Sequence, residues 1–236
     1  MESGEWRVKR WFSLLSTLHS PLSTKMKGNL IIISSPSGGG KGTLIKEVLE
    51  SVPNIGYSVS YTTRAMRDGE ENGRDYFFVS RAEFSGLIEA AEFLEFAEVH
   101  GNLYGTSVNR VQQEISSGND VILEIDVQGA ENIRRKMPEA VAIFILPPSF
   151  EVLRQRLIAR ATEQQADLSL RLRNSINEVR QYEYFDYIVV NDEVKRATSD
   201  LQNIVLAERL RRIRQIEVAQ GILDSFDVSK LITPGD

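Results

Sequence analysis

One short segment, residues 35–43, has the residue types of a phosphate-binding loop: Ser35-Pro36-Ser37-Gly38-Gly39-Gly40-Lys41-Gly42-Thr43. Glycines let several backbone N–H groups converge on one anion, and a lysine beside them can reach the terminal phosphates of a nucleotide. The match to the usual pattern is imperfect, because Ser35 occupies the place of the first glycine and Gly42 that of a Mg²⁺-binding hydroxyl. We predict phosphate binding through Lys41 and the surrounding backbone; the alternative is an ordinary glycine-rich turn.

The elements on either side of this segment fit that prediction. Residues 30–34 are a run of strand-forming residues, and residues 43–51 have the amphipathic pattern of a helix. A strand, a glycine-rich turn and a helix in this order bring the positive end of the helix dipole to the phosphate site.

Further apolar runs alternate with helical patterns along the chain. The patterns predict strands at residues 121–126, 141–146 and 187–190, and helices at residues 130–136, 150–160 and roughly 195–217. Continuous apolar strands separated by helices indicate an α/β fold with a parallel sheet covered on both faces. Ligands of such sheets bind at the carboxyl ends of the strands, where the glycine-rich segment already lies.

Residues 55–105 interrupt this alternation. Residues 57–61 and 76–79 predict short strands around a charged stretch, and together they indicate a small antiparallel insert. Within it Arg64 and Arg67, with tyrosine hydroxyls nearby, could bind a second phosphate through forked donors. A solvated charged turn is the alternative.

Several motifs, taken together, resemble those of the bacterial guanylate kinases. They occur in the family's order over about residues 28–212: Ser37-Gly-Gly-Gly-Lys-Gly-Thr43, Ser58-Val-Ser60, Thr62-Thr-Arg-x-x-Arg67, Gly69-Glu70, Gly73-x-Asp75-Tyr76, Phe93-Leu-Glu95, Gly101-Asn-x-Tyr-Gly-Thr106, Ile125-Asp-x-Gln-Gly129, Ile145-x-Pro-Pro-Ser149 and Val190-Asn-Asp192. Any one of these motifs is weak, but several in register are specific.

The resemblance implies a P-loop NTPase-type parallel sheet covered by helices, with a small mixed α/β GMP-binding insert and a lid. The implied kinase domain covers residues 26–212, with its core at 28–54 and 107–212, the insert at 55–106 and the lid at about 160–171. Residues 1–25 would be an N-terminal extension, and residues 213–236 the end of the last helix and a tail.

The implied activity is transfer of the γ-phosphoryl group of ATP to GMP or dGMP, with Mg²⁺, giving ADP and GDP. By resemblance, residues 35–43 would hold the ATP phosphates and Asn191 would lie near the adenine. The GMP phosphate would be bound by Arg64, Arg67, Tyr76 and Tyr104. The guanine would be recognised by Ser60, Glu95, Thr106 and Glu124, the last of which is often Asp in the family.

The resemblance also assigns three arginines, Arg156, Arg160 and Arg171, to the transferring phosphoryl group. Asp126 would lie near the magnesium and contact it through water, because Gly42 supplies no hydroxyl. Ala161 departs from the glycine that usually follows the lid arginine.

Two carboxylates have the right chemistry for guanine. Guanine presents N1–H and N2–H₂ donors on one edge, and a carboxylate accepts hydrogen bonds, so Glu95 and Glu124 could bind guanine and reject adenine. The alternatives are a surface helix charge for Glu95 and a paired strand carboxylate for Glu124. Glu124 lies within the apolar run at residues 121–126, where a carboxylate is costly unless something binds it.

Two other functions compete with this one. Membrane-associated guanylate-kinase-like scaffolds recruit peptides, but their loss of catalysis should be visible at the loop lysine or the paired arginines, and Lys41, Arg64 and Arg67 are all present. A related kinase acting on a sugar phosphate would not require the four guanine-binding residues together.

Composition restricts the remaining possibilities. The chain has 236 residues, a net charge of −5, no cysteine and only two histidines, His19 and His100. Disulfides, thiol catalysis and His-rich metal sites are therefore excluded, and nothing suggests a nucleic-acid or membrane partner. The absence of cysteine fits a cytoplasmic protein. The sequence leaves the oligomeric state open.

The two ends of the chain are less informative. Residues 1–25 are basic and amphipathic around Trp6 and Trp11. A disordered leader, or a true start at Met26, is the favoured interpretation, and a membrane-surface or targeting segment is the alternative. The arginines of the last helix, Arg209, Arg211, Arg212 and Arg214, predict a solvated face.

Overall fold

The computed structural model describes residues 27–99, 101–160 and 165–226. Residues 1–25 and Ala161, about which the sequence raised questions, lie outside these residues. Residues 27–211 form one compact unit, and the described residues from Arg212 onward belong to a second one. The larger unit contains every candidate site residue.

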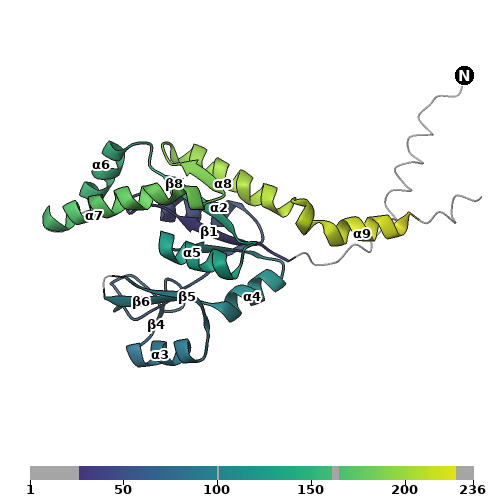
Figure 1. Cartoon of the computed structure of the whole chain (residues 1–236), viewed down its shortest axis with the longest axis horizontal. Coiled ribbons are helices and arrows are strands. Elements are labelled where there is room, and N and C mark those ends of the chain that lie inside the picture. The colour runs from purple at the N-terminus through teal and green to yellow at the C-terminus, as the bar shows by residue number, and fades with distance from the viewer. Residues whose placement is uncertain (1–26, 100, 161–164, 227–236) are drawn as a thin grey trace, which may run out of the picture. The chain divides into compact units, whose positions relative to one another are not determined.

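Within the described residues, a five-stranded parallel sheet forms the centre of the larger unit (Figure 1). Its order is β2-β7-β1-β8-β9, and its strands are Ile55–Tyr57, Asp120–Glu124, Leu30–Ser34, Val141–Leu146 and Tyr187–Val190. The α/β prediction is confirmed, as are the strands at residues 30–34, 141–146 and 187–190. The strand predicted at 121–126 ends at Glu124 because Asp126 caps the following helix, its Oδ1 accepting from Gly129 N at 2.7 Å.

Helices cover both faces of this sheet. On one face α2 (Lys41–Ser51) and α8 (Val194–Arg209) pack against Ile31, Ile33 and their neighbours. On the other, α4 (Val108–Ser116) and α5 (Val127–Lys136) cover Leu30 and Ile32. A strand buried on both faces must be apolar at every position, which is why residues 30–33 are Leu-Ile-Ile-Ile.

The insert forms a second sheet of four strands in the described part of the chain, in the order β4-β3-β6-β5. These strands are Phe77–Phe78, Tyr61–Thr62, Asn102–Ser107 and Phe93–Val99. β3 pairs with β4 in parallel and with β6 antiparallel, so the antiparallel insert expected from the residue pattern is wrong and the sheet is mixed. The helix α3 (Arg81–Glu89) lies beyond this sheet and starts at a capping box between Ser80 and Glu83.

One predicted strand proved to belong to both sheets. Of residues 57–61, Tyr57 ends β2 in the central sheet, and Tyr61 starts β3 in the second. Residues 58–60 therefore connect the two sheets, which brings Ser60 to the boundary between them.

The helices between β8 and β9 complete the larger unit. They are α6 (Phe150–Arg160), α7 (Gln165–Val179) and the short 3₁₀ helix η1 (Arg180–Tyr184). Ser149 caps α6 as predicted, its Oγ accepting from Val152 N at 3.2 Å. The helix predicted at 195–217 is wrong in extent: α8 ends at Arg209, and η2 (Arg212–Arg214) and α9 (Ile216–Ser225) follow as separate elements.

Arg209 is not part of a solvated face, contrary to the prediction. Its Nε donates to Asp120 Oδ2 at 2.7 Å, and Asp120 is 2% exposed. Asp120 Oδ1 in turn accepts from Asn29 N at 2.6 Å, so this pair connects the end of α8 to β7 and to the start of β1.

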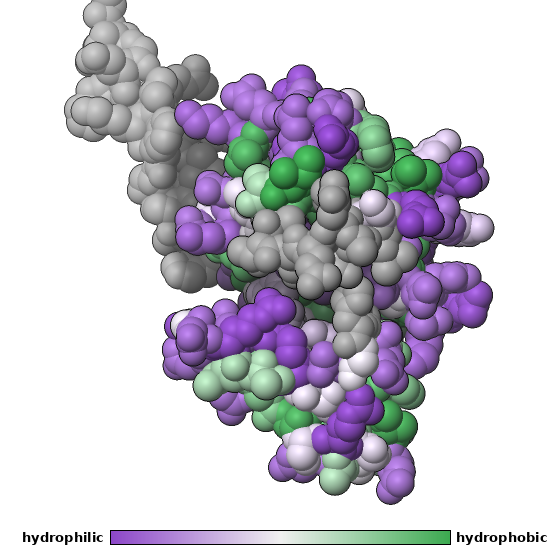
Figure 2. Space-filling view, turned by 90° about the vertical axis from the view of Figure 1, so that its left-hand side faces the viewer, coloured by the Kyte–Doolittle hydropathy of each residue, from purple (hydrophilic) through white to green (hydrophobic). Residues whose placement is uncertain are grey.

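The face that carries α6, α7 and the second sheet is largely hydrophilic, with apolar side chains in small separate areas (Figure 2). Among the described residues, the helices are all too short or too polar to cross a membrane.

Candidate active site

The glycine-rich segment connects β1 to α2 through a turn that needs glycine at two positions. Gly38 and Gly40 have φ angles of 84° and 90°, which side chains rarely adopt. A Cβ on Gly40 would come within 2.3 Å of Asn191 Nδ2. That amide donates to the Gly39 carbonyl at 2.9 Å, so the residue after β9 holds the turn in place. Gly42 has open space around it, and the turn does not require a glycine there.

The N-terminus of α2 has the features of an anion site. In the described structure the helix is capped by Gly40 without a side-chain hydrogen bond, and its first turn contains no acidic residue. The first N–H groups of a helix need acceptors, and their partial positive charge favours a phosphate. Lys41, the first residue of the helix, lines the adjoining cavity.

This cavity, of about 290 Å³, lies between the central sheet and the insert. Residues from both parts of the chain line it: Lys41, Tyr57, Ser60, Tyr76, Glu95, Ala97, Tyr104, Glu124, Ile125 and Asp126. Seven of these ten residues, all except Tyr57, Ala97 and Ile125, were sequence candidates. The structure thus brings the donor-loop lysine together with five of the eight candidate GMP-binding residues, whereas Arg64, Arg67 and Thr106 do not line this space.

Glu95 is the most unusual carboxylate of the cavity. It is 7% exposed, and its Oε1 accepts a hydrogen bond from the Thr106 hydroxyl at 3.0 Å. The pKa of Glu95 is raised to about 7, mainly by burial and in part by the Asp126 charge, while the Thr106 hydrogen bond and the Lys136 charge oppose the rise. A carboxylate that is costly to keep charged without a partner is suited to binding a donor from a ligand. Thr106 itself is fully buried, so it contacts Glu95 from behind the cavity.

Glu124 ends β7 and lines the cavity together with Lys41 and Asp126. Two tyrosines lie near it. The Glu124 charge contributes to raising the pKa of both Tyr57 and Tyr76, although burial is the largest cause for each. The carboxylate is therefore in an environment of phenol donors, on the same wall as the loop lysine.

Arg64 lies among the aromatic rings of the insert, over Tyr76, which lines the cavity, and near Phe78. Its guanidinium carbon is 5.4 Å from the centre of the Tyr76 ring, and the pKa of Arg64 is raised mainly by Glu70, with a smaller contribution from Tyr104. Its Nη2 donates to Glu70 Oε1 at 2.7 Å. Glu70 also accepts from the backbone N–H of Arg67 at 2.8 Å, whereas the Arg67 side chain is exposed. A carboxylate thus occupies donors that could serve a phosphate.

The amino-acid sequence of this chain is similar to those of known proteins. A family model described as guanylate kinase matches residues 27–208. The guanylate kinase of Neisseria meningitidis serogroup A is 48% identical over 204 residues, covering 86% of this chain and all of that protein. That of Geobacter sulfurreducens is 46% identical over 198 residues, covering 84% of this chain and 98% of that protein. The chain belongs to the guanylate kinase family.

A solved structure agrees with this assignment. The crystal structure of guanylate kinase from Anaplasma phagocytophilum has a TM-score of 0.72 and 36% identity, and covers 86% of this chain and 97% of that one. The expected P-loop NTPase-type fold of the guanylate kinases is confirmed by this match and by the parallel sheet described above.

The arginines expected near the transferring phosphoryl group differ in their surroundings in this guanylate kinase. Arg156 donates from Nη2 to the Asn191 carbonyl at 2.9 Å and from Nη1 to the Gly39 carbonyl at 3.4 Å. It therefore supports the donor loop in the structure described here. Arg171 lies in α7, half-buried, and its carbonyl accepts from Ser175 Oγ at 2.8 Å. Arg160 ends α6, and its side chain lies outside the described part.

Sequence reasoning missed a contact between α7 and the donor loop of the guanylate kinase. Glu178 Oε2 accepts from the backbone N–H of Ser37 at 3.0 Å, and Ser175, fully buried, lies against the same residue. Glu70 and Tyr57 were also missed as site residues. A glutamate 141 residues away from the loop gives no local signal, whereas Glu70 follows the paired arginines closely enough to have been considered.

Asp126 is suited to contact a Mg²⁺ ion through water and not as a direct ligand. It is exposed at the cavity beside Lys41, but one of its oxygens already caps α5. No group of three or more acidic or histidine ligands occurs in the described ranges. A carboxylate at this place is a suitable partner for a Mg²⁺ hydration shell, and the remaining ligands would be nucleotide oxygens and water.

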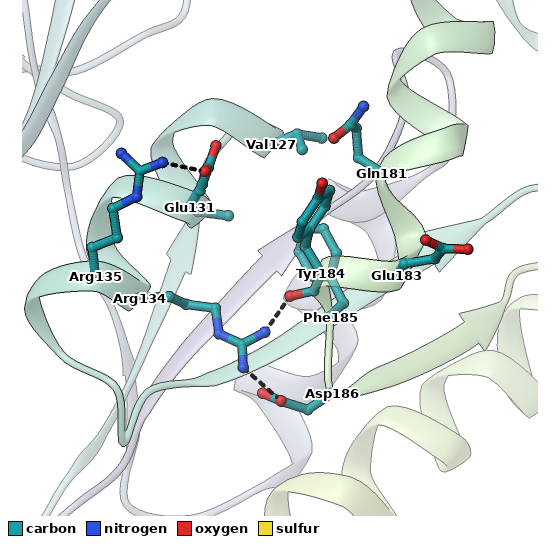
Figure 3. Close-up of a pocket in the computed structure, with 10 residues that line it drawn as sticks. Val127, Glu131, Arg134, Arg135, Gln181, Glu183, Tyr184, Phe185 and Asp186 are labelled. Carbon is teal, nitrogen blue, oxygen red and sulfur yellow. Dashed lines mark hydrogen bonds and ion pairs between the residues drawn. The ribbon is translucent and has the colours of Figure 1, made fainter.

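The largest of the cavities described lies elsewhere. It has about 480 Å³ and is bounded by α5 and η1 (Figure 3). Its two arginines are engaged: Arg134 with the Tyr184 carbonyl and Asp186, and Arg135 with Glu131. None of the candidate residues from the sequence lines this cavity, and its arginines already pair with carboxylates. Cavity volume alone therefore does not identify the nucleotide site.

Proposed function

We propose that this member of the guanylate kinase family transfers the γ-phosphoryl group of ATP to GMP and dGMP, giving ADP and GDP or dGDP, at the cavity between the central sheet and the insert. One observation carries the proposal: the donor-loop lysine, Lys41, and the buried carboxylate Glu95 line the same cavity of about 290 Å³. A cation for phosphates and an acceptor for a base edge in one space suit a nucleoside monophosphate.

The acceptor nucleotide would be bound at both of its ends. Glu95 and Glu124 accept hydrogen bonds from the guanine N1–H and N2–H₂ groups, Ser60 contributes a hydroxyl, and Thr106 orients Glu95. Arg64, Arg67, Tyr76 and Tyr104 bind the phosphate. Because no residue is assigned to the ribose 2′-hydroxyl, dGMP is expected to serve as a substrate.

The donor nucleotide would lie on the glycine-rich segment. The N–H groups of residues 35–43 and the Lys41 ammonium bind the ATP phosphates, and Asn191 lies toward the adenine. Arg156, Arg160 and Arg171 neutralise charge on the transferring group once the lid, at about residues 160–171, closes over it. Mg²⁺, when bound to the phosphates and through water to Asp126, would offset their negative charge.

The chemical step needs no covalent intermediate with the protein. An oxygen of the GMP phosphate attacks the γ-phosphorus of ATP and forms the new P–O bond, while the bond between that phosphorus and the β–γ bridging oxygen breaks and ADP leaves. Such a transfer depends on alignment and on compensation of charge, which the lysine, the arginines and Mg²⁺ supply. A reaction that consumes ATP and GMP is expected in the cytoplasm.

The test is a coupled assay of ADP release with GMP, dGMP, AMP and ribose 5-phosphate offered separately, with and without Mg²⁺. GMP and dGMP should be phosphorylated and the other two should react at least ~100-fold more slowly, because an adenine would leave both carboxylates unpaired. ADP release with a sugar phosphate but not with GMP would overturn the proposal.

A further inference from the structure

Tyr57 and Glu124 occupy neighbouring places at the carboxyl end of the central sheet. Tyr57 is the last residue of β2, and its Cα pairs with that of Ile122 in β7. Paired residues of adjacent strands point to the same face, and Glu124 follows Ile122 by two positions, so the Tyr57 and Glu124 side chains share one face. Both side chains line the cavity that holds Lys41.

The Tyr57 phenol and the Glu124 carboxylate also interact. Tyr57 is 36% exposed, yet the protein atoms around its phenol raise the pKa of that group above its usual range, and the Glu124 carboxylate adds to the rise by its charge and by hydrogen bonding. These effects have the sign expected for a phenol that donates its proton to a charged carboxylate. A phenol that donates to Glu124 uses one lone-pair position of the carboxylate, so the other positions would stay available to a ligand.

Tyr57 differs from the other two tyrosines of the cavity, Tyr76 and Tyr104, in its position in the fold. Tyr76 and Tyr104 belong to the insert and lie beside Arg64, at the proposed phosphate end. Tyr57 belongs to the central sheet and precedes residues 58–60, where the chain crosses into the insert. Tyr57 and Glu124 thus lie on neighbouring strands of the same sheet, so the phenol can orient the carboxylate without a residue of the insert.

We propose that Tyr57 is a positioning residue for guanine selection: its hydroxyl donates to Glu124 and holds that carboxylate in the orientation that accepts hydrogen bonds from the guanine edge. This inference rests on the proposed function of Glu124. Preorganised acceptors bind a donor edge more tightly than carboxylates that must first be ordered. Tyr57 would therefore affect the recognition of GMP and not the transfer step.

The test compares Tyr57→Phe with a matched control, Tyr182→Phe. Tyr182 also bonds a carboxylate through its hydroxyl, Glu183 Oε1 at 3.4 Å, but it is exposed on η1 and does not line the cavity. Tyr57→Phe should raise the KM for GMP by ~10-fold or more, the usual effect of losing a hydrogen bond to a charged group, with kcat within ~2-fold and an unchanged KM for ATP. Tyr182→Phe should change none of the three.

A double-mutant cycle with Glu124→Gln separates positioning from a structural role. If Tyr57 acts through Glu124, Tyr57→Phe should change the KM for GMP by less than ~2-fold in the Glu124→Gln background. Equal fold-changes in both backgrounds, or no effect of Tyr57→Phe on the KM for GMP, would overturn the inference.

Failure of this inference can be told apart from failure of the proposed function. If Glu124→Gln raises the KM for GMP while Tyr57→Phe does not, Glu124 recognises guanine without help from Tyr57 and only the inference is wrong. If the wild-type protein does not prefer GMP to AMP, the proposed function is wrong and the inference is wrong with it.

Discussion

The Thr106 hydroxyl donates to the Glu95 carboxylate at 3.0 Å, and both residues are buried. β5 and β6 pair these residues directly, so the second sheet fixes their relation. This hydrogen bond favours the charged carboxylate but does not offset its burial, since the pKa of Glu95 remains raised to about 7. Glu95 is thus poised to gain a partner.

The affinity for GMP should rise with pH through the pKa of Glu95. In the free enzyme Glu95 is largely protonated below pH 7 and charged above it, and the charged form accepts guanine donors better. We expect kcat/KM for GMP to increase by ~10-fold between pH 6 and pH 8. The GMP phosphate titrates in this range too, so Glu95→Gln serves as the control: its profile should keep only the phosphate contribution. Identical profiles would contradict the assignment.

Glu95 should also cost stability in the absence of GMP. The pKa of Glu95 is raised in the folded state, so proton binding by Glu95 favours the folded protein. This contribution to stability is fully present below the unfolded pKa of 4.5 and is lost as the pH rises through about 7. Glu95→Gln should therefore stabilise the ligand-free protein by about 1–3 kcal/mol at pH 8 and by much less at pH 5, while weakening GMP binding. Thermal unfolding at the two pH values measures this. A variant that loses stability at pH 8 would show that the charge is already compensated.

Lys41 should act on the transfer step. If its ammonium stabilises charge that develops during transfer, Lys41→Ala should lower kcat by roughly 100-fold or more, with little change in the KM for GMP. Lys46→Ala is the control, because Lys46 lies on the same helix with an exposed side chain that pairs with Glu50 at 3.9 Å. A near-normal kcat in a correctly folded Lys41→Ala variant would contradict this prediction and indicate that the glycine-rich segment has a structural role only.

Arg64 should bind the GMP phosphate through its forked geometry. Lysine keeps the charge but loses the paired donors, so Arg64→Lys should raise the KM for GMP by ~10-fold or more and leave the KM for ATP unchanged. Arg74→Lys gives a matched control in the same insert, since Arg74 is 60% exposed and pairs with Glu71 and Asp75. Equal effects of the two variants on the KM for GMP would contradict a specific role of Arg64 and favour a solvated charged turn.

Arg209 should contribute to stability and not to catalysis. Arg209→Ala would leave the buried Asp120 carboxylate without its cation, which costs about 3–5 kcal/mol for such pairs. Arg196→Ala, on the same helix but in an exposed pair with Asp192, should cost less than about 1 kcal/mol. Urea unfolding of the two variants gives the comparison. Equal small losses would mean that Asp120 is satisfied by Asn29 alone.

Much of this protein is determined by short stretches of sequence. The run at residues 30–34, the glycines of the donor loop and Lys41 specify a strand, a turn and a helix N-terminus among neighbours in the chain, because backbone preferences and burial of both strand faces act locally. The same holds for the strands at residues 141–146 and 187–190. The resemblance to guanylate kinases added the acceptor residues, since it depends on the order of several such stretches.

Tertiary structure decided what those residues contact. Asn191 reaches Gly39 across 152 positions and Arg209 reaches Asp120 across 89, and no local pattern encodes such pairs. The burial that raises the pKa of Glu95 depends on packing of β5 against β6 and α5, and Tyr57 comes near Glu124 only because β2 joins the edge of the central sheet. Charge, protonation and partner depend on surroundings assembled from distant segments, and for that reason only the folded chain determines them.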